Sequence, residues 1–317
     1  MVFGAVGNNY TFGQFGDQNN MCIDQRGFNT WIKGEASTFL ANNDQRLLLN
    51  SIVSNIQYSS TGVKITHSNG CIQADQAIVT FSLGVLQHES VTFTPELPDW
   101  KKTAIEMFEM GTYTKIFLQF PYTFWDPTTQ FMLYADPVSR GYYPLFQSLG
   151  TPGFLPGSNI LFVVVVNEEA YRVERQSDAT TKAEVMKVLR KMFPNAPDPI
   201  AFTYPRWSQL PWARGSFSNW PTGTTLEMHQ NLRANVGRVW FAGEHTSAPY
   251  FGFMHGAWFE GRDVGNRVAG LVGGVCKNKG ANGCGMMSFY DPLRGTTEVN
   301  EYNVKNGWDT SYKPYLG

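Results

Sequence analysis

Helix signals occur in three parts of the chain. The clearest is "DATTKAEVMKVLRKMF" (178–193), whose apolar stripe consists of Val185, Val188, Leu189 and Met192. Residues 27–40 also carry apolar side chains at helical spacing, and residues 93–108 have the proline-led start that favours a short helix. We therefore expect helices in all three segments.

Strand signals fill much of the remaining sequence. Residues 113–120 ("YTKIFLQF"), 131–135 ("FMLYA") and 160–166 ("ILFVVVV") are short, apolar and rich in β-branched or aromatic residues. Residues 47–81 contain several short β-rich runs separated by Ser-Thr-Gly and Ser-Asn-Gly turns. Strand and helix signals alternate without an internal repeat, which predicts a mixed α/β fold.

Composition limits the possible classes of protein. The chain has 317 residues, 42% of them hydrophobic and 16% charged, which is typical of a globular protein with one large or two ordinary domains. Its net charge of −1 gives no support to a nucleic-acid partner. The longest apolar run, residues 160–166, is too short to span a membrane.

The four cysteines give no metal site, because no Cys-x-x-Cys pair or zinc spacing occurs. We expect scattered buried thiols at all four positions, Cys22, Cys71, Cys276 and Cys284. Cys276 and Cys284 could alternatively close a small disulfide if the protein is exported.

Residues 238–270 hold the densest candidate chemistry. An apolar strand, residues 239–242, runs into Gly243 and Glu244, and a helix is expected from about Met254. That helix contains Gly256, Gly261 and Gly265, each costing about 1 kcal/mol relative to alanine, so we expect another group to approach its backbone closely. A strand end that leads into a helix N-terminus suits a cofactor, and Glu244 suits hydrogen bonds from sugar hydroxyls.

Two other kinds of site are possible alternatives for these residue types. Glu244, His245 and His255 could bind a metal, but their spacing matches no metalloprotease pattern and no third ligand is evident. Neither "TFSLGVL" nor "GSFSNW" completes the Gly-x-Ser-x-Gly of a serine hydrolase. We expect no metal, and His245 is better interpreted as an ordinary hydrogen-bonded histidine.

Five motifs in the same order resemble the FAD-dependent amine oxidase family, in its plant and fungal polyamine oxidase branch. The resemblance runs from about Phe15 to Leu271. The motifs are "TFSLGVLQ", "YTKIFLQFP", "TKAEVMKVLRKMFP", "RGSFSNWPTG" and "GEHTSAPYFGFMHGAWFEG".

The resemblance implies a role for particular residues. Lys115 would hold a water beside the flavin, with Tyr113 next to it. Phe217, Phe253 and Tyr250 would contact the substrate amine, although relatives often carry tyrosine where this chain has Phe253. The implied FAD-binding residues are Val53, Trp207, Gly243, Glu244, Phe251, Gly252 and Met254.

One departure from the family pattern is the lack of Gly-x-Gly-x-x-Gly, which binds the FAD pyrophosphate. The resemblance therefore implies a fragment: residues 1–108 and 213–272 as portions of the Rossmann-type FAD-binding domain, and 109–212 as a portion of an inserted substrate domain of mixed sheet and helices. Residues 273–317 would be a poorly ordered tail. Prolines clustered between 194 and 211 suggest a crossing between lobes.

The implied activity is oxidation of a secondary amine of spermine, spermidine or an acetylated form, with O2 as acceptor and hydrogen peroxide as product. We expect this chain to be inactive alone and to be a monomer; its compartment is not set by the sequence. Two alternatives stay open: a non-catalytic remnant or interaction module, and a flavin oxidase of amino acids or monoamines.

Overall fold

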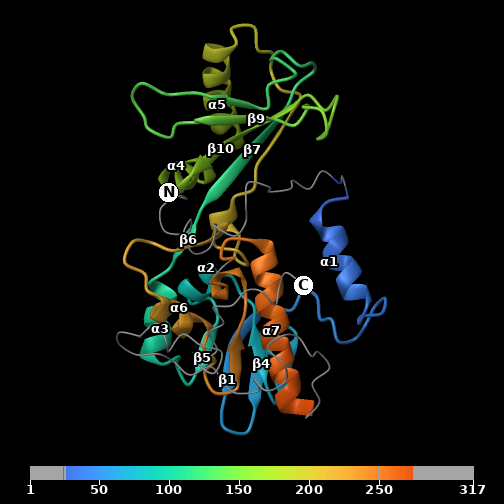
Figure 1. Ribbon diagram of the computed structural model, residues 1–317, viewed down its shortest axis with the longest axis vertical. Coiled ribbons are helices and arrows are strands. Elements are labelled where there is room, and N and C mark those ends of the chain that lie inside the picture. The colour runs from blue at the N-terminus through green and yellow to red at the C-terminus, as the bar shows by residue number, and fades with distance from the viewer. Residues whose placement is uncertain (1–23, 25, 249, 274–317) are drawn as a thin grey trace. The chain divides into compact units, whose positions relative to one another are not determined.

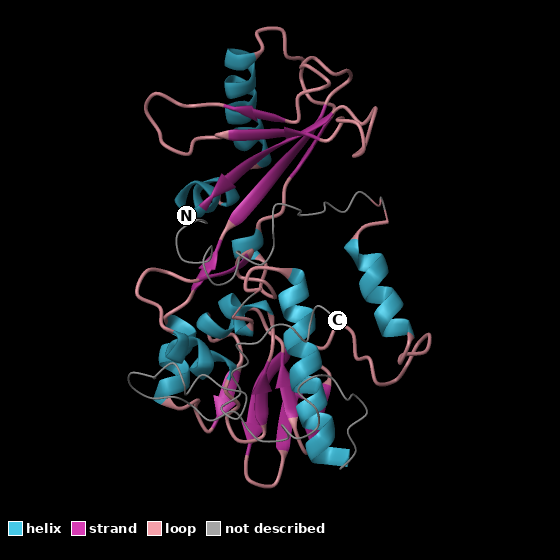
Figure 2. Ribbon diagram, viewed as in Figure 1, coloured by secondary structure: helices cyan, strands magenta, loops and turns pink. Residues whose placement is uncertain are grey.

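The computed structural model describes residues 24, 26–248 and 250–273, and its elements are shown in Figures 1 and 2. The described residues form two compact units. Unit 1 contains residues 24 and 26–49 together with 112–210, and unit 2 contains residues 50–111 and 211–273 apart from residue 249. The boundary after Leu210 lies inside the proline cluster. Mixed sheets and helices confirm the predicted α/β fold class.

Unit 1 is built on a five-stranded antiparallel sheet of order β11-β7-β10-β9-β8. Its strands are β7 (Tyr113–Gln119), β8 (Phe131–Leu133), β9 (Leu145–Ser148), β10 (Ile160–Val166) and β11 (Ala201–Thr203). Its helices are α1 (Phe28–Ser37), α4 (Asn167–Glu174), α5 (Asp178–Met192) and the 3-10 turn η2 (Trp207–Gln209). The predicted strands at 113–120, 131–135 and 160–166 and the helices at 27–40 and 178–193 are confirmed.

Helix α5 covers this sheet through its apolar stripe. Val185, Val188 and Leu189 are at most 1% exposed and pack in one cluster with Ile116 and Leu118 of β7, while Met192 packs at the edge of that cluster. The helix begins after Ser177, whose hydroxyl accepts a hydrogen bond from the Thr180 N–H. The 3.6-residue period therefore predicted the buried face correctly.

Unit 2 contains three small sheets. A four-stranded sheet has the order β3-β2-β1-β5, the pair β13-β4 is parallel, and the pair β12-β6 is antiparallel. The strands are β1 (Val53–Tyr58), β2 (Val63–His67), β3 (Gly70–Ala74), β4 (Ala77–Val79), β5 (Thr92–Thr94), β6 (Glu109–Gly111), β12 (Phe217–Asn219) and β13 (Val239–Phe241). The helical elements are α2 (Leu83–Gln87), α3 (Asp99–Glu106), α6 (Leu226–Arg233), η3 (Glu244–Thr246) and α7 (Met254–Gly273).

A fully buried lysine joins α3 to α6. The Lys101 amino group donates hydrogen bonds to the carbonyls of Asn231, Leu232 and Ala234, at 3.1, 2.5 and 2.7 Å. These carbonyls belong to the end of α6, where backbone acceptors have no partner within the helix. The amine also lies 3.7 Å from the centre of the Phe241 ring, and burial holds the pKa of Lys101 well below its ordinary value.

The expectation for the cysteines is wrong at Cys71, which is exposed on β3 and carries a free thiol. Cys22, Cys276, Cys284 and the predicted tail lie outside the described residues.

Glu260 of α7 makes the stability of unit 2 depend on pH. It is 7% exposed and lies 3.2 Å from the Arg233 guanidinium, yet burial raises its pKa from 4.5 to about 7. Because the folded state holds this proton more tightly than the unfolded state, the stabilising contribution is complete below pH 4.5 and is lost as the pH rises through about 7. We expect that loss to be about 3 kcal/mol, and Glu260→Gln to remove it.

Denaturant titrations of the wild-type and Glu260→Gln proteins at several pH values check this prediction. If the free energy of unfolding changed equally with pH in the wild-type and Glu260→Gln proteins, the prediction would be wrong.

Candidate active site

The carboxylate of Glu244 joins two segments of unit 2. One oxygen accepts the Ser218 N–H at 2.9 Å, and the other accepts the Ser218 hydroxyl and the Gly252 N–H, both at 2.6 Å. Strand β12, which begins at Phe217, is thus fixed to the loop that leads into α7. Burial raises the pKa of Glu244, and the hydrogen bonds from Ser218 and Gly252 oppose that rise. The side chain expected to accept sugar hydroxyls already holds three protein donors, and sequence reasoning missed Ser218.

Gly252 brings the loop against Phe217. Its φ of 78° lies in the left-handed region, and a Cβ there would approach the Phe217 ring to 3.3 Å. The predicted substrate residue Phe217 and the predicted cofactor residue Gly252 are therefore neighbours. Phe253 and Met254 follow directly, and Met254 begins α7.

The aromatic residues of this segment pack mainly on one another. Phe251 stacks on Trp220, with ring centres 5.4 Å apart, and Trp220 is a residue that sequence reasoning missed. Phe253 and the buried Tyr250 both contact the His255 ring, at 5.2 and 4.8 Å between centres. The segment is an ordered aromatic cluster in which Phe217 and Phe253 remain half-buried.

The three glycines of the helix differ in their surroundings, and the approach of a cofactor to Gly261 and Gly265 stays a prediction. A Cβ at Gly256 would lie 2.2 Å from the Tyr250 carbonyl oxygen, so the helix packs tightly under its own preceding loop. A Cβ at Gly261 or Gly265 would meet no described atom within 4 Å. At Gly243 a Cβ would lie 2.6 Å from the His245 ring, which is buried and has its pKa lowered by burial to about 3.

Unit 1 carries the lysine and its tyrosine neighbour. Both lie on β7, and the Lys115 amino group lies 5.2 Å from the centre of the Phe162 ring and 6.0 Å from that of Tyr113. Although Lys115 as a whole residue is exposed, burial around its amino group lowers the pKa, and burial raises the pKa of Tyr113. An amine with a lowered pKa loses its proton more readily than a solvated lysine does.

The other cofactor residues lie in both units. Trp207 begins η2 of unit 1 and is half-buried. Val53 begins β1 of unit 2; because β1 pairs with β5 only from Asn55 onward, the backbone of Val53 extends beyond that partner strand. The structure thus groups Phe217, Glu244 and Gly252 directly, and it places Tyr113 and Lys115 together on another element.

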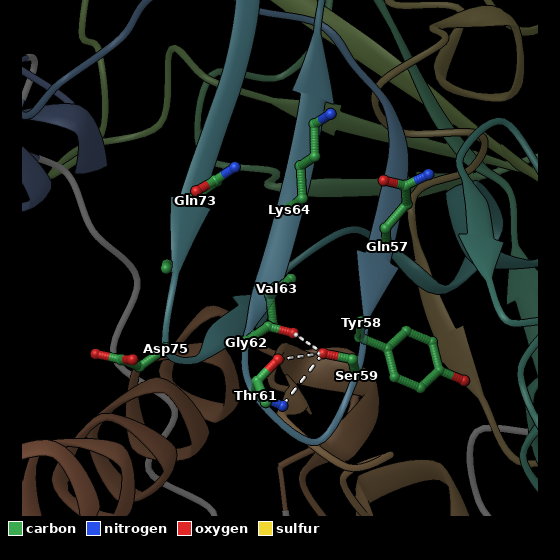
Figure 3. Close-up of a pocket in the computed structure, with 10 residues that line it drawn as sticks. Gln57, Tyr58, Ser59, Thr61, Gly62, Val63, Lys64, Gln73 and Asp75 are labelled. Atoms are coloured by element: carbon green, nitrogen blue, oxygen red, sulfur yellow. Dashed lines mark hydrogen bonds between the residues drawn. The ribbon is translucent and has the colours of Figure 1, made fainter.

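Metal sites, membrane spans and surface pockets are other features that could occur in the part of the chain that the structure describes. No cluster of three His, Cys, Asp or Glu side chains suits a metal there, and no helix is long and apolar enough to cross a membrane. A hollow of about 580 Å³ beside the β1–β2 hairpin is open and lined by residues such as Gln57, Lys64 and Asp75 (Figure 3). None of the predicted site residues lines it.

Comparison with known proteins decides the family. A family model described as flavin-containing amine oxidoreductase matches residues 5–269. The chain belongs to this family. Family membership indicates FAD as the cofactor.

The relatives within this flavin amine oxidoreductase family include plant polyamine oxidases. Polyamine oxidase 7 of Oryza sativa subsp. japonica is 45% identical over 262 residues, which cover 79% of this chain and 55% of that protein. Polyamine oxidase 1 of Zea mays is 44% identical over 265 residues, or 80% of this chain and 52% of that protein. The chain thus spans about half the length of these relatives.

A solved structure of wild-type putrescine oxidase bound to putrescine has a similar fold. It is 17% identical to this chain, with a TM-score of 0.60 over 71% of this chain and 50% of that one.

The residues present fit a flavin. Helix α7 has no acidic residue in its first turn, so the N–H groups and the positive end of the helix dipole suit carbonyl oxygens such as those of the flavin pyrimidine. Val53 pairs with His67 of β2, and its contact with the cofactor stays a prediction. The N–H groups of the first turn of α7 belong to unit 2.

Proposed function

We propose that this chain is part of an FAD-dependent polyamine oxidase. The observation that carries the proposal is the 45% identity with polyamine oxidase 7 over 262 residues. The substrate would be a secondary amine of spermine, spermidine or an acetylated derivative, and the products an imine, then an aldehyde and an amine, with hydrogen peroxide from O2. The expectation of a monomer stays a prediction.

The aromatic residues would bind and orient the substrate. Bound FAD supplies the acceptor for a hydride taken from the carbon beside the amine nitrogen. Phe217 and Phe253 would hold the methylene chain in a dry slot without specific hydrogen bonds, and their ring faces would attract the remaining ammonium groups. Val53 and the first turn of α7 would hold the cofactor.

Lys115 would accept a proton or orient a water at the reacting amine. Its lowered pKa suits an amino group that accepts a proton at Nζ or orients a water for hydrolysis of the imine. Tyr113 would pack beside it and limit access of bulk water.

A chimera tests the proposal. The 317 residues, which contain no Gly-x-Gly-x-x-Gly, are joined to the part of polyamine oxidase 7 that lies outside the match. We expect the purified chimera to show a bound-flavin spectrum that bleaches when spermine is added without oxygen, and to release peroxide in air. The isolated chain with added FAD is measured in parallel and is expected to be inactive.

A chimera that binds FAD but is bleached by no polyamine, while intact polyamine oxidase 7 is bleached, would contradict the proposal. Peroxide release by the isolated chain would contradict only its expected inactivity.

Phe217 gives a prediction about substrate affinity. Replacing it with leucine keeps apolar bulk but removes the ring face, so KM for spermine in the chimera is expected to rise about 2- to 30-fold with little change in kcat, as loss of about 0.5–2 kcal/mol of cation–π attraction would give. Steady-state peroxide assays measure both constants, and Phe217→Tyr serves as the control that retains a ring. An unchanged KM in Phe217→Leu would argue against contact with the substrate.

A further inference from the structure

Glu174 receives an unusual set of hydrogen bonds in unit 1. It ends α4 and is 1% exposed. One carboxyl oxygen accepts the Thr114 hydroxyl at 2.5 Å, and the other accepts both the Ser208 N–H at 2.8 Å and the Ser208 hydroxyl at 2.5 Å. A single buried side chain thus holds a strand and a turn that are 94 residues apart in sequence, as the positions 114 and 208 give by subtraction.

The hydrogen bond from Thr114 to Glu174 holds the part of β7 that carries Tyr113 and Lys115. Thr114 lies between Tyr113 and Lys115, and because side chains alternate along a strand, it faces away from both. Thr114 is fully buried. Holding the Thr114 hydroxyl fixes the strand from the face opposite the lysine, so it sets where the Lys115 side chain leaves the backbone.

The hydrogen bonds from Ser208 to Glu174 hold the 3-10 turn η2, which contains Trp207. Ser208 follows Trp207 directly in η2, and its backbone N–H and hydroxyl both end on Glu174. The backbone carbonyl of Glu174 also accepts the Arg206 Nε at 3.1 Å and the Gln209 side-chain amide at 2.5 Å. Residues on both sides of Trp207 are therefore anchored to the last residue of α4.

We propose that Glu174 is a positioning residue, which sets the placement of Lys115 and Trp207 relative to each other. The inference rests on the proposed function, in which Lys115 acts at the reacting amine, and on the expected role of Trp207 in binding the cofactor. Glu174 acts on these two residues through their chain neighbours Thr114 and Ser208. Its three accepted hydrogen bonds tie β7 and η2 to one side chain and so restrict how the two elements can move relative to each other.

The test reads the two positioned side chains without needing FAD. In the full chain, the solvent-accessible lysines are converted to 13C-dimethyllysine, and 5-fluorotryptophan is incorporated in place of tryptophan during expression. Lys115→Arg and Trp207→Phe assign the two resonances. Thr114→Val is expected to move the titration midpoint of Lys115 by about 0.5 pH units or more. Ser208→Ala is expected to shift or broaden the Trp207 resonance, and Glu174→Ala to change both signals.

Glu174→Gln supplies the rescue. Its amide oxygen can accept both Ser208 donors while its NH2 group donates to a rotated Thr114 hydroxyl, so both signals are expected to stay near those of the wild type. Glu184→Gln is the matched control, because Glu184 is a glutamate of the same unit that accepts instead from Tyr143 and Arg172. It is expected to move neither signal.

Unchanged Lys115 and Trp207 signals in the folded Thr114→Val and Ser208→Ala variants would overturn the proposal, even if stability falls. Equal loss in Glu174→Gln and Glu174→Ala would also overturn it. In the chimera, Glu174→Ala is expected to lower kcat by about 10- to 100-fold. If the signals respond as expected but the wild-type chimera oxidises no amine, the proposed function fails and the placement by Glu174 stands.

Discussion

Replacing Lys115 with methionine is expected to lower the rate of amine oxidation by the chimera by about 100- to 10,000-fold, the usual contribution of a positioned acid or base. Methionine keeps an apolar stem of similar length but can neither hold a proton nor orient a water. Stopped-flow absorbance at the flavin band, with spermine and without oxygen, measures the rate. FAD content is expected to stay unchanged, because the proposed role of Lys115 is at the reacting amine, whereas Val53 and the first turn of α7 would hold the cofactor.

Lys182→Met is the matched control, since Lys182 is an exposed lysine on α5 of the same unit. It is expected to leave the rate within about twofold of the wild type. Burial lowers the pKa of Lys115, so the pH dependence that this group gives to the rate should disappear in Lys115→Met. A Lys115→Met chimera that retains most of the rate would remove Lys115 from the proposed chemistry.

The second large effect is expected at Glu244, where alanine should lower the free energy of unfolding by about 2–4 kcal/mol. The substitution leaves the N–H groups of Ser218 and Gly252 without their acceptor, and a buried donor without a partner costs about 1–3 kcal/mol. Denaturant titration of the full chain measures the change. The same substitution is expected to weaken FAD binding, because it frees the loop that leads into Met254 and α7.

Glu106→Ala serves as the control for that experiment. Glu106 is an exposed glutamate at the end of α3 in the same unit, and its loss is expected to change stability by less than about 0.5 kcal/mol. A Glu244→Ala protein as stable as Glu106→Ala would show that the three hydrogen bonds contribute nothing net to folding.

The regular elements could be predicted wherever one period dominated the sequence. The stripe from Val185 to Met192 and the apolar run of β10 each have a single interpretation, and both predictions were confirmed. Helix α6 was missed because its eight residues bury polar side chains, such as His229 and Gln230, and so carry no apolar stripe. Its end is stabilised by Lys101, which is about 130 residues away in the sequence. The residue pattern within the helix cannot indicate such a distant partner.

For the candidate site, the sequence predicted residues that lie within recognisable motifs, but it did not predict their hydrogen-bond partners from distant segments. The motif containing Glu244 could be recognised, but its actual partners, Ser218 and Gly252, depend on how β12 and the aromatic loop fold together. Glu174 shows the same limit, since nothing around a glutamate at a helix end indicates that a threonine and a serine will share it. At Gly256 the glycine signalled a close approach, but the sequence did not show that the approaching group is the Tyr250 carbonyl of the preceding loop.

Because Lys101 is buried, its chemical modification would report the opening of unit 2. All three of its hydrogen-bond donors are engaged by carbonyls, and its surface is inaccessible, so an acylating reagent can modify it only after α3 separates from α6. Mass spectrometry of the peptide containing Lys101 would therefore count opening events of unit 2, while exposed Lys182 would react at all times. A pulse of reagent could then tell whether a substitution in unit 1, such as Glu174→Ala, leaves unit 2 folded.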